Sequence, residues 1–180
     1  MSETVIQVTS LGKRIKGKTI LEDISFEINK GDCVALIGPN GAGKTVLMSC
    51  ILGDKKPSSG QVLIDGKAGK AKNQIAVLLQ ENTIPNSLKV SELIAFFQSI
   101  SDNPLTNQEV QKLLQFKEDQ YQQFADKLSG GQRRLLAFVL CLIDKPKILF
   151  LDEPTAGMDT STRQRFWEIV NDLKKAGTTI

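Results

Sequence analysis

Cys-Val-Ala-Leu-Ile-Gly-Pro-Asn-Gly-Ala-Gly-Lys-Thr, residues 33–45, decides the fold class. Its first five residues, Cys33–Ile37, are a continuous apolar run, which predicts a short strand covered on both faces. Gly38–Thr45 fits the pattern GxxxxGK[S/T] and leads directly into a helix predicted over Lys44–Leu52. Such a loop directs backbone N–H groups and a helix N-terminus toward a phosphate. The stretch therefore predicts an α/β domain that binds a phosphorylated ligand.

The loop residues have separate predicted tasks. Lys44 places a point charge between the β- and γ-phosphates of a nucleotide, and the Thr45 hydroxyl is a ligand for Mg²⁺. The alternative is an ordinary glycine-rich turn with a solvated lysine. The residues predicted here to bind the nucleotide are Gly38, Pro39, Asn40, Gly41, Ala42, Gly43, Lys44, Thr45 and Val46.

A second motif lies far along the chain. Lys147–Leu151 predicts another buried strand, and Asp152 and Glu153 follow it directly. Ligands of open α/β sheets bind at the carboxyl ends of the strands. Asp152 is therefore a predicted Mg²⁺ ligand, and Glu153 is the predicted general base for an attacking water. The alternative is an exposed pair of carboxylates before Pro154.

A third motif, Leu128-Ser129-Gly130-Gly131-Gln132, opens a helix predicted over Gln132–Ile143. Ser129 suits the N-cap, the two glycines allow close backbone approach, and the helix dipole favours a second anion. This motif is much rarer by chance than the phosphate loop. With both present, the chain resembles the ATP-binding-cassette (ABC) ATPases.

The resemblance covers nearly the whole chain, with five motifs in the family's order. These are the Walker A loop at 38–45, the Q-loop at Gln80, the signature at 128–132, the Walker B strand at 148–153 and the D-loop at 156–159. It implies one domain over 1–180, with an α/β P-loop NTPase (RecA-like) core, an antiparallel β subdomain and a helical signature subdomain. The core is expected at about 1–83 and 145–180, and the helical subdomain at about 84–144.

The resemblance also implies how the site works. Two domains pair head-to-tail around two ATP molecules, so the signature residues Ser129, Gly130, Gly131 and Gln132 would contact a nucleotide held by the partner. Gln80 would bind Mg²⁺ and water and communicate with a membrane partner. Asp159 would communicate across the dimer. Alternatively, Gln80 is an ordinary polar residue at the end of a strand, and Asp159 is a helix N-cap before Thr160.

The implied protein is the ATPase subunit of a transporter whose permease is a separate chain. It resembles the ATPase partners of bacterial ABC-2-type exporters of drugs or peptides, on the cytoplasmic face of the membrane. Residues 81–88 would lie in reach of the permease. Two alternatives stay open: a soluble ABC protein acting on ribosomes or DNA, and a regulatory subunit that hydrolyses ATP poorly.

The chain departs from the family at two important places. Ile15 stands where most members carry an aromatic residue that stacks on adenine, so looser base selectivity is expected. The chain stops at Ile180, a few residues before the expected switch histidine, as in a fragment or a naturally truncated protein. The D-loop, Ala-Gly-Met-Asp, is a milder variation.

Composition excludes several other classes. The 180 residues carry 23 basic and 20 acidic side chains, a net charge of +3, which argues against nucleic acid as a partner. The longest apolar run, Leu135–Ile143, is nine residues, too short to cross a bilayer. The absence of histidine excludes a His-ligated zinc site and a Ser-His-Asp triad within the chain.

Periodicity predicts the remaining elements. Thr106 and Asn107 are both candidate N-caps for the second of the predicted helices. The expected strands are 4–8, 20–28, 61–65 and 74–79, and the expected helices are 90–100, 106–116 and 160–175, with Gly177 as the final helix stop.

Overall fold

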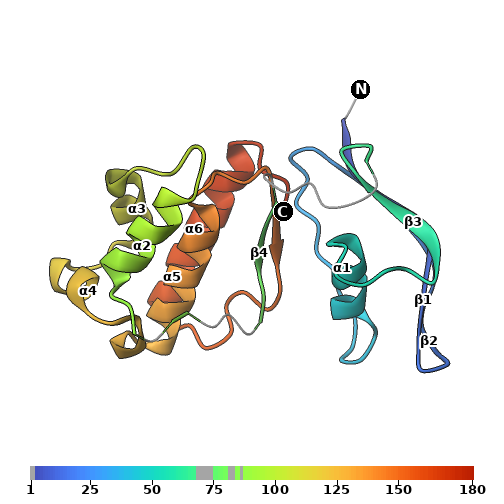
Figure 1. Ribbon diagram of the computed structural model, residues 1–180, viewed down its shortest axis with the longest axis horizontal. Helices are drawn as coiled ribbons and strands as arrows, with labels where there is room; N and C mark the ends of the chain where they lie inside the picture. Colours follow the sequence, from blue (N-terminus) through green and yellow to red (C-terminus); the bar gives the residue numbers. More distant parts are fainter. Residues whose placement is uncertain (1–2, 68–74, 81–83, 86) are drawn as a thin grey trace. The chain divides into compact units, whose positions relative to one another are not determined.

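The computed structural model describes residues 3–67, 75–80, 84–85 and 87–180 (Figure 1). The chain forms two compact units, Met1–Lys72 with Thr179–Ile180 (unit 1) and Asn73–Thr178 (unit 2). This division differs from the predicted core and helical subdomain, whose boundaries near 84 and 144 stay a prediction.

Unit 1 contains an antiparallel sheet of three strands in the order β2-β1-β3. β1 (Thr4–Ile15) and β2 (Lys18–Asn29) form a hairpin whose two turn residues, Lys16 and Gly17, both have positive φ. Such a turn matches the twist of paired strands. β3 (Ser59–Ile64) pairs with β1 on its other edge. The three predicted strands are confirmed, and the first two are longer than predicted.

The apolar face of this sheet forms the core of unit 1. Ile6, Val8 and Leu11 of β1 are buried, together with Ile64 of β3. Helix α1 (Lys44–Ile51) contacts β2 and buries Leu47. Its bounds match the predicted helix to within one residue.

The prediction of a buried strand at Cys33–Ile37 is wrong for this structure. The segment is not a strand, and Val34, Leu36 and Ile37 are 50%, 47% and 88% exposed. An apolar run becomes a buried strand only where neighbouring strands pair with it on both edges. Within the described part of unit 1, the segment's backbone pairs only with Ile180, which accepts from the N–H of Val34 at 2.8 Å. The N–H of Ile180 in turn donates to Asp32.

Unit 2 contains a parallel pair of strands. β4 (Ile75–Leu78) aligns with β5 (Ile148–Leu151), from Ile75 opposite Ile148 to Leu78 opposite Leu151. Parallel pairing of strands this far apart in sequence requires a crossover, and here helices fill it. Both predicted strands are confirmed within the described residues; Gln74 lies outside them.

The helices of unit 2 match the predicted periodicity, and two short ones were not predicted. Thr106 is the N-cap of α3: its hydroxyl accepts from the N–H of Glu109, and the Glu109 carboxylate accepts from Thr106. The unpredicted elements are α4 and η1. The helices are α2 (Val90–Ser99), α3 (Asn107–Leu114), α4 (Glu118–Gln122), η1 (Ala125–Lys127), α5 (Gly130–Leu142) and α6 (Thr160–Lys175).

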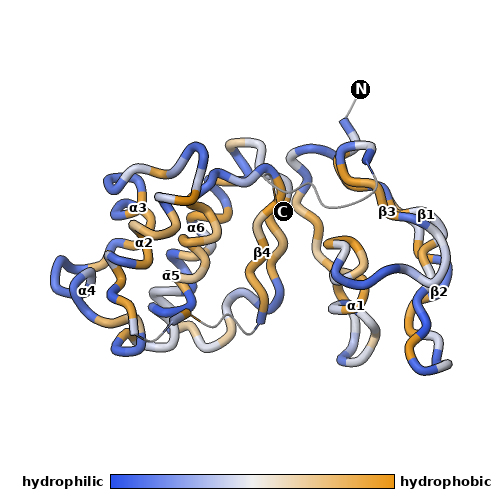
Figure 2. The backbone as a smooth tube through the Cα atoms, in the orientation of Figure 1, coloured by the Kyte–Doolittle hydropathy of each residue, from blue (hydrophilic) through white to orange (hydrophobic). Residues whose placement is uncertain are grey.

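Helix α5 lies at the centre of the core of unit 2. It contacts α2, α3, α6 and β4, and Figure 2 shows how apolar residues concentrate along β4 and its neighbours. Phe138 of α5 and Phe166 of α6 are fully buried, with ring centroids 4.3 Å apart. No helix in the described part of the chain is long and apolar enough to cross a membrane.

Candidate functional site

The phosphate loop lies in unit 1 and leads into α1. Gly41 has φ 81° and Gly43 has φ 90°, values that favour glycine. The Lys44 ammonium folds back over the loop, where it donates to the carbonyls of Gly38 and Pro39 at 2.7 and 2.9 Å. The loop therefore already holds a positive charge above its own backbone.

The amides of this loop are free to bind an anion. Ala42 donates to the Pro39 carbonyl at 3.2 Å, which closes the turn. No residue in the described ranges accepts a hydrogen bond from the other amides of the loop and first helical turn. These N–H groups belong to Asn40, Gly41, Gly43, Lys44, Thr45 and Val46. Unpaired amides at a helix N-terminus form an anion-binding site.

Gly43 fixes the loop against the sheet. A Cβ at this position would lie 2.9 Å from the Leu21 Cδ2 and 3.3 Å from the Ile20 carbonyl oxygen. A side chain would therefore clash with β2 and would also be strained at φ 90°. Strand β2 and the phosphate loop thus pack too closely for any residue but glycine.

The Walker B carboxylates follow β5 in unit 2. The N–H of Asp152 donates to the Leu78 carbonyl at 2.9 Å, which extends the β4–β5 pairing by one residue. Gln80, just beyond β4, donates from Nε2 to Glu153 Oε2 at 3.0 Å. The structure therefore brings the predicted Q-loop glutamine and the predicted general base together at the carboxyl ends of the two strands.

Glu153 has an unusual backbone conformation. Its φ is 44°, in the left-handed region that non-glycine residues rarely occupy. The next residue is Pro154, and a proline disfavours helical conformations in the residue before it. Such strained residues persist only where the surrounding structure holds them.

The signature motif forms the N-terminus of α5. Ser129 Oγ accepts from the N–H of Gln132 at 3.2 Å, and Gln132 Oε1 accepts from the N–H of Ser129 at 3.1 Å. This reciprocal pair is a capping box, so the predicted cap is confirmed. No described residue accepts from the amides of Gly130 and Gly131. The helix N-terminus therefore keeps donors available for an anion.

Gly131 packs against the D-loop of the same chain. A Cβ on Gly131 would lie 3.3 Å from both Asp159 Oδ2 and the Met158 Cα. The neighbouring Gly130 is exposed, and a Cβ there would meet nothing within 4 Å. The two signature glycines therefore differ: only at Gly131 would a Cβ force Met158 or Asp159 to shift by a few tenths of an ångström.

We expect Gly130→Ala and Gly131→Ala to affect stability differently. Alanine in the middle of a helix is favoured over glycine by about 0.5–1 kcal/mol, and Gly130 and Gly131 are the first two residues of α5. Gly130→Ala should therefore raise the free energy of unfolding by up to that amount. Gly131→Ala should lose this gain, because its methyl group pushes Met158 and Asp159 apart. Urea unfolding of both variants measures the difference; equal gains in stability would contradict the packing argument.

Asp159 is the N-cap of α6, as one of the two interpretations of its sequence position predicts. Its carboxylate accepts from the N–H of Thr162 at 2.9 Å and from the hydroxyls of Ser161 and Thr162. These hydrogen bonds, that from the Thr162 N–H first, hold the pKa of the carboxyl well below its usual range. Asp159 is therefore a fixed negative charge beside the signature glycine.

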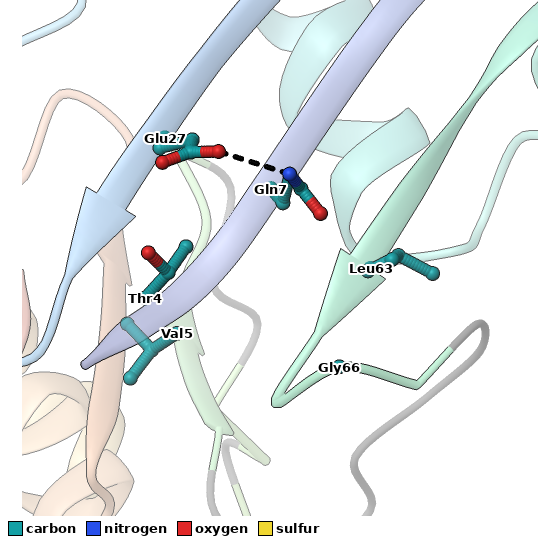
Figure 3. A pocket seen from close by; sticks show the side chains of 6 residues that line it. All are labelled: Thr4, Val5, Gln7, Glu27, Leu63 and Gly66. Atoms are coloured by element: carbon teal, nitrogen blue, oxygen red, sulfur yellow. Dashed lines mark hydrogen bonds between the residues drawn. The ribbon is translucent and has the colours of Figure 1, made fainter.

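Ile15 ends β1 in unit 1, opposite Lys18 across the hairpin, and is 36% exposed. Unit 1 also has a shallow hollow, in which Gln7 Nε2 donates to Glu27 Oε1 at 2.9 Å (Figure 3). No residue predicted to bind nucleotide lines it. The residues lining it are Thr4, Val5, Gln7, Glu27, Leu63 and Gly66.

One site residue was missed by the sequence interpretation. Arg134 of α5 is buried and donates to the backbone carbonyls of the segments that carry Gln80 and Glu153. The available signal was an arginine on the buried face of a helix, two residues after the signature motif. A buried arginine requires hydrogen-bond partners, but the sequence does not say which.

The family model described as ABC transporter matches residues 21–156, which include the Walker A, Q-loop, signature and Walker B motifs. The chain belongs to the ABC transporter ATP-binding family. The predicted family is therefore confirmed.

Two curated relatives and one solved structure illustrate the similarity. The chain is 34% identical to the Nod factor export ATP-binding protein I of Ralstonia nicotianae, across 99% of this chain and 59% of that protein. It is 36% identical to the spermidine/putrescine import ATP-binding protein PotA of Protochlamydia amoebophila, across 86% of this chain and 44% of that protein. The chain thus spans less than two thirds of both ABC relatives.

The solved structure of the ATP-binding subunit of an ABC transporter superposes with a TM-score of 0.82 at 25% identity. The match covers 97% of this chain and 77% of that one. This agreement confirms the predicted fold class, an α/β P-loop NTPase with an antiparallel β region and a helical region.

Proposed function

We propose that the chain binds and hydrolyses ATP as the nucleotide-binding part of an ABC transporter. The hydrogen bond between Gln80 and Glu153 carries this proposal. It places an amide and a carboxylate side by side at the carboxyl ends of two parallel strands, where ligands of such sheets bind. A carboxylate oriented in this way can accept a proton from an attacking water.

The phosphate loop supplies the binding step. Its unpaired amides and the Lys44 ammonium stabilise the negative charge of the β- and γ-phosphates. Lys44 exchanges its two loop carbonyls for phosphate oxygens when a nucleotide enters. No covalent chemistry is required of the protein, because positioning and charge stabilisation dominate phosphoryl transfer.

Three predicted metal ligands fit Mg²⁺ by donor chemistry. Thr45 offers a hydroxyl, Asp152 a carboxylate and Gln80 an amide oxygen, and Mg²⁺ prefers such hard oxygen donors. Thr45 is exposed in the first turn of α1, so its hydroxyl is accessible to a metal. When bound, Mg²⁺ would neutralise charge on the phosphates.

In the hydrolytic step, Glu153 accepts the proton of the attacking water. Gln80 donates to one carboxylate oxygen, which leaves the other oxygen of Glu153 available for the water. This hydrogen bond thus orients the carboxylate that accepts the proton. The water oxygen bonds to the γ-phosphorus as the bond from that phosphorus to the bridging oxygen of the β-phosphate breaks, so ADP leaves, and Lys44 stabilises the charge on the γ-phosphate.

Pairing of two chains would complete the site. Ser129 and Gly130 are exposed, and the amides of Gly130 and Gly131 have no acceptor in the described part of the chain. These features support a head-to-tail dimer in which this helix N-terminus, with Gln132 in its first turn, binds the γ-phosphate of the partner's ATP. Asp159, beside Gly131, would transmit closure of one site to the other.

The other partner would be a separate transmembrane permease, which would hold this chain at the cytoplasmic face of the membrane. We propose export of a drug-like or peptide-like molecule, because the Glu153–Asp159 stretch, Glu-Pro-Thr-Ala-Gly-Met-Asp, resembles that of exporter ATPase subunits. Relatives named for export and for import match this chain across 99% and 97%, so coverage does not distinguish the two directions. Of the residues expected to face the permease, 81–83 and 86 lie outside the described residues.

The proposal is tested on the protein in the longest form that its gene encodes. Phosphate release at saturating Mg-ATP measures hydrolysis, and affinity purification from membranes identifies the partner. Turnover together with a membrane-spanning partner is the expected result. Purification with ribosomes or DNA instead would contradict the transporter assignment, and tight ATP binding without turnover would indicate a regulatory subunit.

We expect Ile15 to discriminate weakly between purines. Stacking on an aromatic ring contributes about 0.5–1.5 kcal/mol beyond area burial, so its loss relaxes selectivity by up to about tenfold. Dissociation constants for ATP and GTP should therefore be comparable. Ile15→Tyr should restore selectivity, with a change of up to about tenfold in the ratio of the two dissociation constants. An ATP preference above about a hundredfold in the parent chain would contradict this expectation.

A further inference from the structure

All three nitrogen atoms of the Arg134 guanidinium group donate hydrogen bonds to backbone carbonyls. Nε donates to Pro154 at 3.2 Å, Nη1 donates to Leu79 and Gln80 at 2.5 and 3.1 Å, and Nη2 donates to Asp152 and Glu153 at 2.9 and 3.3 Å. A guanidinium has five N–H donors. Each donor thus has a carbonyl acceptor.

This arrangement is buried. Arg134 is 9% exposed, and burial lowers the pKa of its guanidinium, partly offset by nearby Cys141, Asp152 and Glu153. Cys141, two turns along the same helix, lies 3.5 Å from the Val77 carbonyl of β4. Helix α5 is therefore fixed along β4 by two side chains, and one of them reaches across to the end of β5.

The five carbonyls belong to the two segments that carry the hydrolytic pair. Leu79 and Gln80 continue β4, and Asp152–Pro154 continue β5. Glu153 is held at φ 44° before a proline, a conformation that its surroundings must impose. Arg134 donates to the backbone carbonyls of Asp152, Glu153 and Pro154. It is therefore the side chain best placed to impose this backbone conformation on Glu153.

We propose that Arg134 is a positioning residue for ATP hydrolysis. It aligns the Gln80 and Glu153 backbones so that their side chains meet, and it links this pair to the helix that begins with the signature motif. The proposal rests on the proposed ATPase function. It predicts a loss of turnover with nucleotide affinity preserved, because every hydrogen bond of Arg134 within the described residues goes to a backbone carbonyl of unit 2, whereas the phosphate loop belongs to unit 1.

Arg165 provides a matched control. It too donates from its guanidinium to two backbone carbonyls, those of Lys112 and Leu113, and it pairs with Glu168 at 3.1 Å. It lies in the same unit but contacts no residue of the hydrolytic pair. Arg165 substitutions therefore report the general effect of removing a structural arginine.

The experiment compares Arg134→Gln and Arg134→Lys with the same changes at Arg165, in the longest form of the protein. Steady-state phosphate release gives kcat, equilibrium titration gives the Kd of ATP, and thermal unfolding gives Tm. Misplacing a catalytic group by about 1 Å costs about a hundredfold in rate. We expect Arg134→Gln to lower kcat about 10- to 100-fold with the Kd within about threefold. Arg134→Lys should recover part of the rate, since an ammonium keeps three donors.

If Arg134 had only a structural role, kcat would not fall specifically in the Arg134 variants. The proposal is overturned if Arg134→Gln keeps its kcat, or if Arg165→Gln loses as much kcat at a similar Tm. If Arg134→Gln does not fold, Arg134→Lys alone decides, and a parent-like kcat for it overturns the proposal. A parent protein without any phosphate release would contradict the ATPase function itself, and ATP affinity would still separate that result from misfolding.

A second readout removes the ambiguity between positioning and stability. When two residues act through one another, the effects of substituting them are strongly non-additive. Arg134→Lys should therefore change the residual rate less than about twofold when Glu153 is already glutamine. An equal fractional loss in both backgrounds would show that Arg134 does not act through Glu153.

Discussion

Replacing Glu153 with glutamine is expected to lower the rate of ATP hydrolysis by about 10²–10⁴-fold, the usual contribution of a general base. Glutamine keeps the shape of the side chain and retains an oxygen that can accept the hydrogen bond from Gln80 Nε2. It loses the negative charge that accepts the proton from water. Binding of ATP should be unchanged, and the ATP-bound dimer should accumulate.

Single-turnover phosphate release and size-exclusion chromatography with ATP measure these two outcomes. Glu168→Gln is the matched control, since Glu168 pairs with Arg165 on α6 and touches neither Gln80 nor Asp152. It should keep the parent rate. Hydrolysis by Glu153→Gln at near the parent rate would show that another group accepts the proton.

The features predicted correctly from sequence are those that local chemistry determines. The Ser129 cap and the helix after Gly43 depend on residues within one turn of each other, and both are observed. Strand β5 was also predicted, because a short apolar run with a carboxylate at its end left few alternatives, but its parallel pairing with β4 was not. Local pattern was sufficient for most elements.

The features that could not be predicted depend on tertiary neighbours. Burial of Cys33–Ile37 was expected from its composition, but composition does not provide strands on both edges. The contact of Gly131 with Asp159 joins residues far apart in sequence. Arg134 was overlooked for the same reason, because its five acceptors come from two separate segments.

Replacing Lys44 with methionine is expected to weaken ATP binding about a hundredfold. A hydrogen bond to a charged group contributes about 1.5–3 kcal/mol, and about 3 kcal/mol corresponds to about two factors of ten in Kd. Methionine preserves the length and the apolar stem of the side chain but removes the ammonium. The Gly38 and Pro39 carbonyls also lose their donor, yet both lie on an exposed loop where water replaces it.

Isothermal titration of both ATP and AMP tests this assignment most sharply, with Lys30→Met as the control. Lys30 lies in the same unit and forms an exposed ion pair with Glu3, so its loss should change the Kd of ATP by less than about twofold. AMP lacks the β- and γ-phosphates that Lys44 is proposed to bind. If the ammonium acts there, Lys44→Met should change the Kd of AMP little while that of ATP rises about a hundredfold. Equal weakening of both nucleotides would mean that the substitution disrupts the loop as a whole, and that the charge is not directed at the terminal phosphates.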